Sequence, residues 1–242
     1  MQKNILITGV SSGIGHGLAK YYLKTGYHVY GVSRRETQID SERFHFMTLD
    51  IAKFNQIQNT ITTLLEGVTS LELVVLNAGI LPTFGDMKET SLENIDQTMQ
   101  VNVWSNKVLL DCLISHIPNI KQVIGISSGA SQSGARGWNA YALSKATLNM
   151  LLSLYAAEEP HIHFSALAPG LVDTPMQDYL NQLEPSPIYP VLGRLQSAKG
   201  TPDMPLPDEA AHKLAQSFEK VLSQPSGEFA DIRNLHSILL RN

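Results

Sequence analysis

The chain of 242 residues has one cysteine, no strong excess of charge and no long apolar run. Cys112 alone cannot form an internal disulfide, and its apolar neighbours indicate a small core residue. A net charge of -4 gives no basic field for nucleic acid or an anionic membrane, so neither is expected as a partner. Because no run of about 18 apolar residues and no secretory segment after Met1 is found, we expect a cytoplasmic protein.

The chain also has few grouped metal ligands and no repeats. His161 and His163 share one face of an expected strand, but no acidic or cysteine partner is spaced nearby, so we expect no metal site. Low-complexity tracts are missing as well. The length fits a single α/β domain over residues 1–242, although length alone also allows two smaller domains.

What the chain does have is a regular alternation of two hydrophobic patterns. Strand-like runs cover 4–8, 27–33, 43–49, 71–76, 120–127, 162–168 and 228–232, and helical patterns cover 13–25, 54–67, 92–116, 139–158 and 208–223. This alternation predicts parallel strands joined by right-handed helical crossovers. The expected fold class is therefore α/β, a doubly wound parallel sheet of Rossmann type with about seven strands and helices on both faces.

A glycine-rich turn follows the first expected strand. Glycines permit a tight turn and close approach of the backbone to a pyrophosphate, and the next helix offers its N-terminal N–H groups to an anion. The spacing Gly-x-x-x-Gly-x-Gly differs from the usual dinucleotide fingerprint, and a tight turn without a ligand is the alternative. We interpret the segment as binding a dinucleotide through Gly9, Ser11, Ser12, Gly13, Ile14 and Gly15.

The end of the second expected strand indicates which dinucleotide is bound. An acidic residue there would accept the ribose hydroxyls of NAD, but the chain has Ser33, Arg34 and Arg35 instead. Guanidinium and hydroxyl groups suit a 2′-phosphate, which favours NADP(H) as the cofactor. The alternative is a solvated charge pair that Glu36 partly neutralises.

Tyr141 and Lys145 are spaced four apart on an expected helix, with Ser128 thirteen residues before the tyrosine. The phenol and the ammonium then project from one helix face. A free tyrosine has a pKa near 10, and a neighbouring cation is expected to lower the pKa of Tyr141 and make it an acid–base group. By itself the pair also fits a half-buried ring beside a solvated charge.

Together these motifs resemble the short-chain dehydrogenase/reductase family over essentially the whole chain. The matching segments are Thr8-Gly9-x-x-x-Gly13-Ile14-Gly15, Asn77-Ala78-Gly79, Ser128, Tyr141-x-x-x-Lys145 and Pro169-Gly170. The resemblance implies that Asp50 and Ile51 lie near the adenine, that Asn77, Ala78 and Gly79 form the turn after the fourth strand, and that Pro169, Gly170, Val172 and Thr174 hold the nicotinamide end. It implies Ser128, Tyr141, Lys145 and Asn102 as the catalytic residues.

Two of these residues have simpler interpretations, and a third has a neighbour of the same type. Asp50 fits a cap on the following turn. Asn102 fits a buried amide whose hydrogen bonds are satisfied. Ser127 adjoins Ser128, and the separation of thirteen residues from Tyr141 selects Ser128 as the catalytic one.

From 171 to 207 many prolines break any long helix, with one short helical piece expected near 176–183. Such long connections are often lids or binding loops, so we interpret this one as the substrate loop. The expected apolar wall residues are Met176, Tyr179, Leu180 and Tyr189, with Trp138 from the start of the catalytic helix. Ordinary packing is the alternative for each.

The local sequence around Gly137-Trp138-x-x-Tyr141 and Ala168-Pro169-Gly170 resembles the sepiapterin reductase and benzil reductase branch of the family. That likeness implies NADPH-dependent hydride transfer to a ketone of a small aromatic or vicinal dicarbonyl compound, with Tyr141 as general acid. Alternatives are a pterin ketone reductase that uses Asp231 as the substrate anchor, and a non-catalytic NADP-binding sensor. Family likeness also implies a homodimer or homotetramer built on the helices near 92–116 and 139–158.

Overall fold

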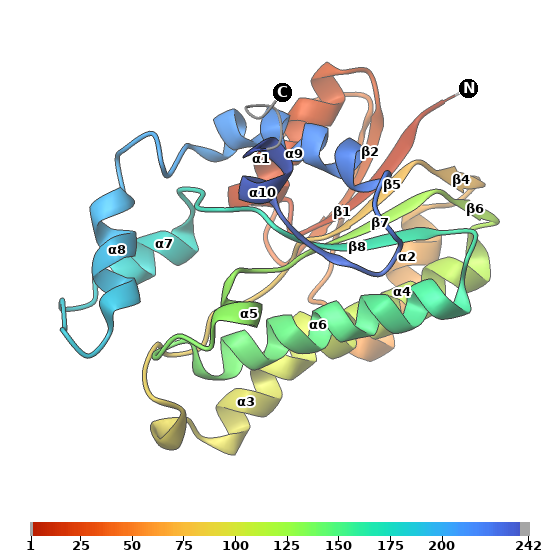
Figure 1. The fold of residues 1–242 in the computed structure, drawn as a ribbon. Coiled ribbons are helices and arrows are strands. Elements are labelled where there is room, and N and C mark those ends of the chain that lie inside the picture. Colours follow the sequence, from red (N-terminus) through yellow and green to blue (C-terminus); the bar gives the residue numbers. More distant parts are fainter. Residues whose placement is uncertain (1, 238–242) are drawn as a thin grey trace.

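The computed structural model describes residues 2–237 and contains a central sheet of seven parallel strands (Figure 1). Its order is β3-β2-β1-β5-β7-β8-β9. The strands are β1 Asn4–Thr8, β2 His28–Ser33, β3 Phe44–Thr48, β5 Leu73–Leu76, β7 Gln122–Ile126, β8 His163–Ala168 and β9 Phe229–Asp231. Because the order runs outward in both directions from β1 and β5, the sheet is doubly wound, which confirms the predicted α/β class.

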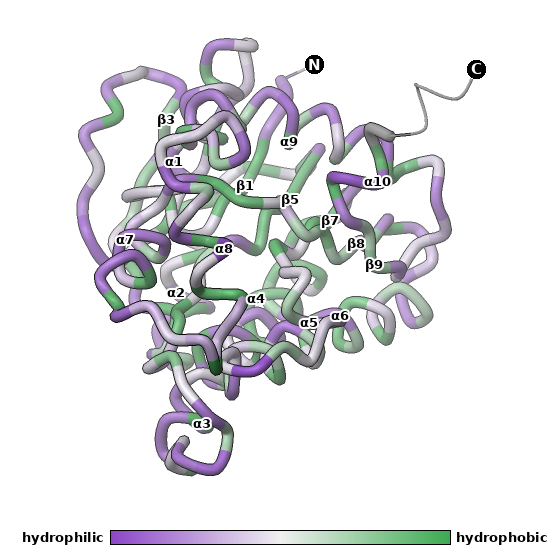
Figure 2. Tube along the Cα trace, turned by 60° about the vertical axis from the view of Figure 1, so that its left-hand side comes forward, coloured by the Kyte–Doolittle hydropathy of each residue, from purple (hydrophilic) through white to green (hydrophobic). Residues whose placement is uncertain are grey.

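Helices pack on both faces of the sheet (Figure 1). One face carries α2 (Phe54–Leu64), α4 (Ser105–His116) and α6 (Asn139–Glu158), and the other carries α1 (Gly13–Lys24), α9 (Pro207–Val221) and α10 (Ile232–Ser237). Within β1, Leu6 packs in the first core, whereas Ile5 and Ile7 pack in the second. Central strands are thus apolar on both faces, visible as the green stretches of β1 and β5 in Figure 2. No helix within residues 2–237 is both long and apolar enough to cross a bilayer.

Several predicted elements are divided in the structure. The expected helix 92–116 consists of α3 (Leu92–Met99), a π-helical turn (Gln100–Trp104) and α4. The strands expected at 71–76 and 120–127 lose their first residues to β4 (Ser70–Leu71) and β6 (Asn119–Ile120), which pair with each other. A π turn marks an extra residue in a helix and is often found at functional sites, and no periodicity in the sequence signals it.

The connection between β8 and α9 contains two helices that stand at the left of Figure 1. They are α7 (Pro175–Asn181), which confirms the short helix expected near 176–183, and α8 (Pro190–Ala198), which was not predicted. Proline is the first residue of both, a position where the missing N–H would have no partner in the helix. The prolines of this connection therefore start helices as well as interrupt them. We call residues 171–207 the cover.

Close contact between α1 and α9 depends on Gly17. A Cβ at this position would lie against the Pro207 carbonyl, 2.7 Å from its carbon atom. Because a backbone group cannot give way as a side chain can, Gly17→Ala is expected to lower the free energy of unfolding by about 1–3 kcal/mol in urea titrations. The matched control is Gly193→Ala in α8, where a Cβ would meet nothing within 4 Å. Equal stability of the two variants would contradict this account of the α1–α9 contact.

Candidate active site

A cavity of about 1280 Å³ opens at the carboxyl ends of the central strands, under the cover. This exceeds the volume of ordinary small-molecule pockets and leaves room for an extended ligand beside a second molecule. Most predicted site residues line it: Gly9, Ser11, Ser12, Gly13, Ile14, Ser33, Arg34, Arg35, Asp50, Ile51, Asn77, Ala78, Gly79, Ser128, Trp138, Tyr141, Lys145, Pro169, Gly170, Val172, Thr174, Met176 and Asp231. Gly15, Asn102, Tyr179 and Tyr189 are not among the residues that line it.

The turn between β1 and α1 lets backbone approach the cavity closely. Gly9 and Gly13 have φ values of +78° and +60°, which residues with a side chain rarely adopt. A Cβ on Gly15 would lie 2.5 Å from Asn77 Nδ2, so this glycine serves the packing of helix on strand. Asn77 Nδ2 in turn donates to the carbonyl oxygens of Thr8 (2.8 Å) and Gly9 (3.3 Å) and holds the turn in place.

The N-terminus of α1 suits an anion such as a pyrophosphate. Ser12 is its N-cap residue, and within the described residues its side chain makes no capping hydrogen bond. The first N–H groups of the helix are then available to a ligand, and the helix dipole favours a negative charge there. Gly13 adds to the cradle, because a Cβ on it would lie 3.2 Å from Thr174 Cγ2 on the opposite wall. These residues fit a dinucleotide.

Next to this turn, the end of β2 presents two guanidinium groups. Arg34 and Arg35 both line the cavity and are exposed. Arg35 Nη2 donates to Ser12 Oγ (3.2 Å), and the Ser33 hydroxyl donates to the Arg35 carbonyl (2.6 Å). Asp50 lines the same region while its Oδ1 accepts from the Ala52 N–H (3.1 Å), so the capping contact and the place in the wall coexist.

Tyr141, Lys145 and Ser128 meet in the cavity. Tyr141 and Lys145 lie one turn apart on α6, and Ser128 follows β7. The Ser128 side chain hydrogen-bonds the Tyr141 hydroxyl, and Ser128 Oγ also accepts from the Ala130 N–H (3.1 Å) at the start of α5 (Ala130–Ser133). The structure therefore places two hydroxyl groups side by side, where a single oxygen atom can contact both.

The expectation that Lys145 lowers the pKa of Tyr141 is wrong for this structure. Burial raises the pKa of Tyr141 to about 12, and the hydrogen bond from Ser128 opposes the rise only in part. Desolvation disfavours the phenolate more than its neighbours favour it. At neutral pH the phenol is therefore protonated, which is the form that donates a proton.

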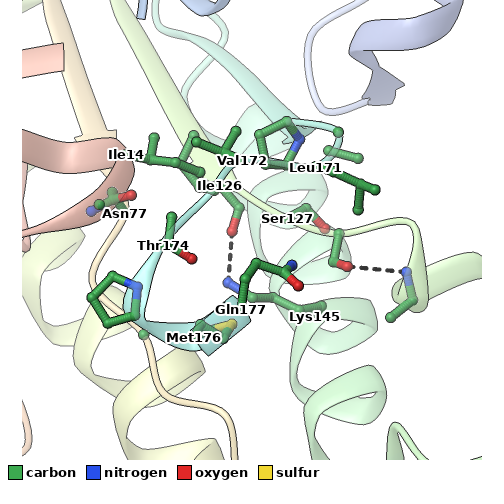
Figure 3. A pocket seen from close by; sticks show the side chains of 18 of the residues that line it. Ile14, Asn77, Ile126, Ser127, Lys145, Leu171, Val172, Thr174, Met176 and Gln177 are labelled. Carbon is green, nitrogen blue, oxygen red and sulfur yellow. Dashed lines mark hydrogen bonds between the residues drawn. The ribbon is translucent and has the colours of Figure 1, made fainter. Parts of the chain in front are cut away.

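Lys145 lies nearly buried beside the tyrosine. Its Nζ donates to the Ile126 carbonyl oxygen (2.7 Å), the dashed line at the centre of Figure 3, and lies 5.7 Å from the centroid of the Tyr141 ring. Burial lowers the pKa of Lys145 to about 8. Thr174 and Met176 of the cover line the same cavity as Lys145 (Figure 3). A cation at neutral pH is thus held within reach of the tyrosine.

Asn102 has a bracing position in the π-helical turn. Its Nδ2 donates to the Ile80 carbonyl (2.9 Å) and to Ser144 Oγ (2.9 Å), and its Oδ1 accepts from the Ile80 N–H (2.8 Å). The side chain is fully buried. These contacts match the simpler interpretation of a satisfied buried amide, which ties the segment after β5 to the helix that carries Tyr141.

The apolar part of the wall comes from the cover and from the start of α6. Met176, Leu180 and Leu195 line the cavity together with Trp138. Phe84 meets the Trp138 ring edge-on from behind (88°, 5.5 Å between centroids). Phe84, Leu195 and two further arginines of the wall, Arg194 and Arg233, were not predicted, because no spacing in the sequence links them to the motifs.

Tyr179 and Tyr189, expected in the wall, do not line it and instead connect the cover to Phe84. The Tyr179 hydroxyl accepts from the Phe84 N–H (3.0 Å), and Tyr189 packs edge-on against Phe84. Arg136 donates to both carboxylate oxygens of Asp86 (2.6 and 2.5 Å) and lies over the Tyr189 ring. This Arg136 pairing lowers the pKa of Asp86.

Asp231, the expected substrate anchor, lines the cavity at the end of β9 but is occupied by a neighbour. Both of its carboxylate oxygens accept hydrogen bonds from Arg233. The pairing with Arg233 lowers the pKa of Asp231. Among the described residues, no group of three or more histidine, cysteine or acidic side chains is placed to hold a metal ion.

A sheet of this topology, with a glycine turn and a Ser-Tyr-Lys group in one cavity, defines a class of nucleotide-dependent oxidoreductase. The family model described as short chain dehydrogenase matches residues 3–185. The chain belongs to the short-chain dehydrogenase/reductase family.

Among its relatives are two enzymes named benzil reductase, (S)-benzoin forming. The one from Bacillus subtilis strain 168 is 25% identical over 239 residues, which is 94% of this chain and 97% of the relative. IRC24 from Saccharomyces cerevisiae is 32% identical over 236 residues, covering 89% and 90% of the two chains. The crystal structure of the short-chain dehydrogenase/reductase YIR035C from Saccharomyces cerevisiae superposes with a TM-score of 0.84 at 25% identity, covering 97% of this chain and 98% of that one.

Proposed function

We propose that the protein is an NADPH-dependent carbonyl reductase that transfers hydride to a ketone of a small aromatic or vicinal dicarbonyl compound. The observation that carries this proposal is the Ser128–Tyr141 hydrogen bond beside Lys145, in a cavity that also contains the glycine turn. Two hydroxyl groups that share one oxygen-binding position suit a carbonyl, whose oxygen becomes negative during reduction. The relatives named benzil reductase support the dicarbonyl class.

The side chains of the site have separate roles in the proposed reduction. Tyr141, protonated because its pKa is about 12, gives its proton to the carbonyl oxygen. Ser128 donates a hydrogen bond to the same oxygen as charge develops. Lys145 stabilises the tyrosinate that is left and would hold the nicotinamide ribose. Asn102, expected as a catalytic residue, supports the site indirectly through its hydrogen bonds to Ser144 of α6 and to Ile80.

NADPH, when bound, supplies the hydride. Gly9, Gly13 and the N-terminus of α1 would hold its pyrophosphate, and Thr174 with Pro169, Gly170 and Val172 would hold its nicotinamide end. The 2′-phosphate would lie against Ser33, Arg34 and Arg35.

The pH dependence of the reaction follows from Lys145. Its pKa is lowered to about 8, so its positive charge is present below that pH and is lost as the pH rises through it, while Tyr141 stays protonated. We expect kcat/KM for ketone reduction to be level near neutrality and to fall about tenfold per pH unit above about pH 8. A profile that stays level to about pH 10 would show that the charge of Lys145 is not required.

A pterin substrate is the second possibility, supported by the relative named NADPH-dependent pterin aldehyde reductase from Arabidopsis thaliana, 29% identical over 71% of this chain. Against it, the carboxylate of Asp231 is already bound by Arg233. A non-catalytic NADP sensor would not need Ser128, Tyr141 and Lys145 together in one cavity.

NADPH oxidation, followed at the nicotinamide absorbance with diketones, quinones, sepiapterin and simple ketones, tests the proposal. We expect turnover with aromatic diketones. Turnover with sepiapterin alone would favour the pterin enzyme. No NADPH oxidation with any of these compounds, despite tight NADPH binding, would favour the sensor.

We also propose that the protein is a homo-oligomer assembled through α6. Leu143, Met150 and Leu154 are exposed on one stripe of this helix, with exposed fractions of 47%, 61% and 54%. Trp104, the last residue of the π-helical turn before α4, is 43% exposed as well. Apolar side chains in such a row support burial against a second copy, as a dimer or tetramer.

A further inference from the structure

Asn149 lies on the same face of α6 as the two catalytic residues of that helix. Tyr141, Lys145 and Asn149 follow one another at intervals of four residues, which places them about one turn apart along one side. The proposed reduction uses the first two and gives the third no role. Asn149 is partly buried and is not among the residues that line the cavity, so a part in the reaction must be indirect.

The Asn149 amide bonds the segment after β7 on both sides of Ser128. Asn149 Oδ1 accepts a hydrogen bond from the Ser127 hydroxyl (2.5 Å), and Asn149 Nδ2 donates one to Ser131 Oγ (2.9 Å). The Ser131 hydroxyl in turn donates to the Ser128 carbonyl oxygen (2.7 Å), to which the Ser131 N–H also donates (3.0 Å). Ser128 therefore lies between two anchors that a single side chain holds against α6.

This network connects the sheet to the helix through the Ser128 segment. The Ser127 N–H donates to the Leu167 carbonyl of β8 (2.8 Å), so the residue before Ser128 is fixed in the sheet. Because an amide nitrogen only donates, Ser131 accepts from Asn149 and uses its own proton on Ser128. A leucine at position 149 could make neither bond, and it would leave the buried Ser127 hydroxyl without its acceptor.

We infer that Asn149 is a positioning residue for the reduction and acts through Ser128. It keeps the Ser128 hydroxyl at hydrogen-bond distance from that of Tyr141, so that both hydroxyls contact the same carbonyl oxygen. This inference rests on the proposed reductase function. A hydroxyl aimed at the place where charge develops loses much of its effect when it is displaced, and a shift of about 1 Å can cost on the order of 100-fold in rate.

Replacement of Asn149 with leucine, which has a similar shape, tests this role. For Asn149→Leu we expect kcat with an aromatic diketone to fall about 10-fold, and by no more than in Ser128→Ala, because Asn149 acts only through Ser128. NADPH affinity, measured by the change in its fluorescence, should stay unchanged. The matched control is Asn59→Leu, the same substitution at an exposed position of α2, which should leave kcat unchanged.

A double-mutant cycle separates positioning from a general loss of stability. In the Ser128→Ala background there is no hydroxyl left to position, so the addition of Asn149→Leu should change kcat by less than about threefold. Losses that multiply would overturn the inference. Ser131→Ala removes the middle of the link to the Ser128 carbonyl and should reproduce most of the Asn149→Leu loss. It decides the question if Asn149→Leu does not fold, because an unchanged kcat in Ser131→Ala would also overturn the inference.

A crystal structure of Asn149→Leu, or of Ser131→Ala, gives a result that does not depend on turnover. If the unaltered enzyme reduces no ketone, the proposed reductase function fails, and the crystal structure still decides the positioning. We expect Ser128 Oγ to have moved out of hydrogen-bond distance of the Tyr141 hydroxyl, while Lys145 still donates to its backbone carbonyl after the strand. A Ser128 hydroxyl that has not moved would overturn the inference.

Discussion

Tyr141→Phe is expected to lower kcat for ketone reduction by about 10²- to 10⁴-fold, the usual contribution of a general acid. Phenylalanine keeps the ring and its contact with Trp138 but removes the hydroxyl that Ser128 contacts. The measurement is steady-state NADPH oxidation with an aromatic diketone.

A binding control shows whether the Tyr141→Phe loss lies in the chemical step. NADPH affinity, followed by fluorescence, should change little, because the glycine turn and the arginines of β2 remain. The control variant is Tyr155→Phe on the same helix, whose hydroxyl contacts Asp111 outside the cavity wall. Wild-type turnover by Tyr141→Phe would contradict the assigned role of the phenol.

Replacing Arg34 and Arg35 together with alanine is expected to lower kcat/KM for NADPH on the order of 100-fold, because two charge-assisted hydrogen bonds to a phosphate are lost. NADH has no 2′-phosphate, so its kcat/KM should change little. The ratio of the two values measures the effect, and raising the salt concentration should reduce it, since both arginines are exposed.

The matched control for these cofactor variants is Arg43→Ala, which removes an arginine that lies outside the cavity wall and donates to the Leu23 carbonyl. It should leave both cofactors unaffected. A wild-type enzyme that prefers NADH would contradict the assignment of Arg34 and Arg35 to the 2′-phosphate.

The fold could be predicted from local sequence pattern because its strands and helices each have a hydrophobic pattern within a few consecutive residues. Runs such as Ile5 to Ile7 are apolar without interruption, as a strand buried on both faces must be, and the helices between them repeat at helical spacing. The order of the strands follows from the handedness of the crossovers. Local pattern does not predict where contacts with distant residues interrupt a helix. The π turn around Asn102 is such an interruption, and the Asn102 side chain there bonds Ile80.

The candidate site also contains residues that local pattern predicts and residues that it does not. Gly9, Ser128, Tyr141 and Lys145 were predictable because each follows a strand end or lies at helical spacing from the next. Phe84 was not, because its partner Trp138 is far away in the chain. Arg233 was not, because no motif in the sequence places it in the cavity wall. The pKa of Tyr141 could not be predicted either. A neighbouring lysine can be read from four-residue spacing, whereas the loss of hydration that outweighs it exists only in the folded molecule.

The charged contacts that hold the cover in place are sensitive to ionic strength. At one end Lys199 pairs with Asp173 (2.7 Å) and Asp178 (2.5 Å), and at the other Arg136 and Asp86 hold Tyr189. Few of these contacts are deeply buried, so dissolved ions compete with them. The rates at which an uncharged ketone enters and its alcohol product leaves should therefore rise with ionic strength, even where the bond-making step itself is indifferent to it.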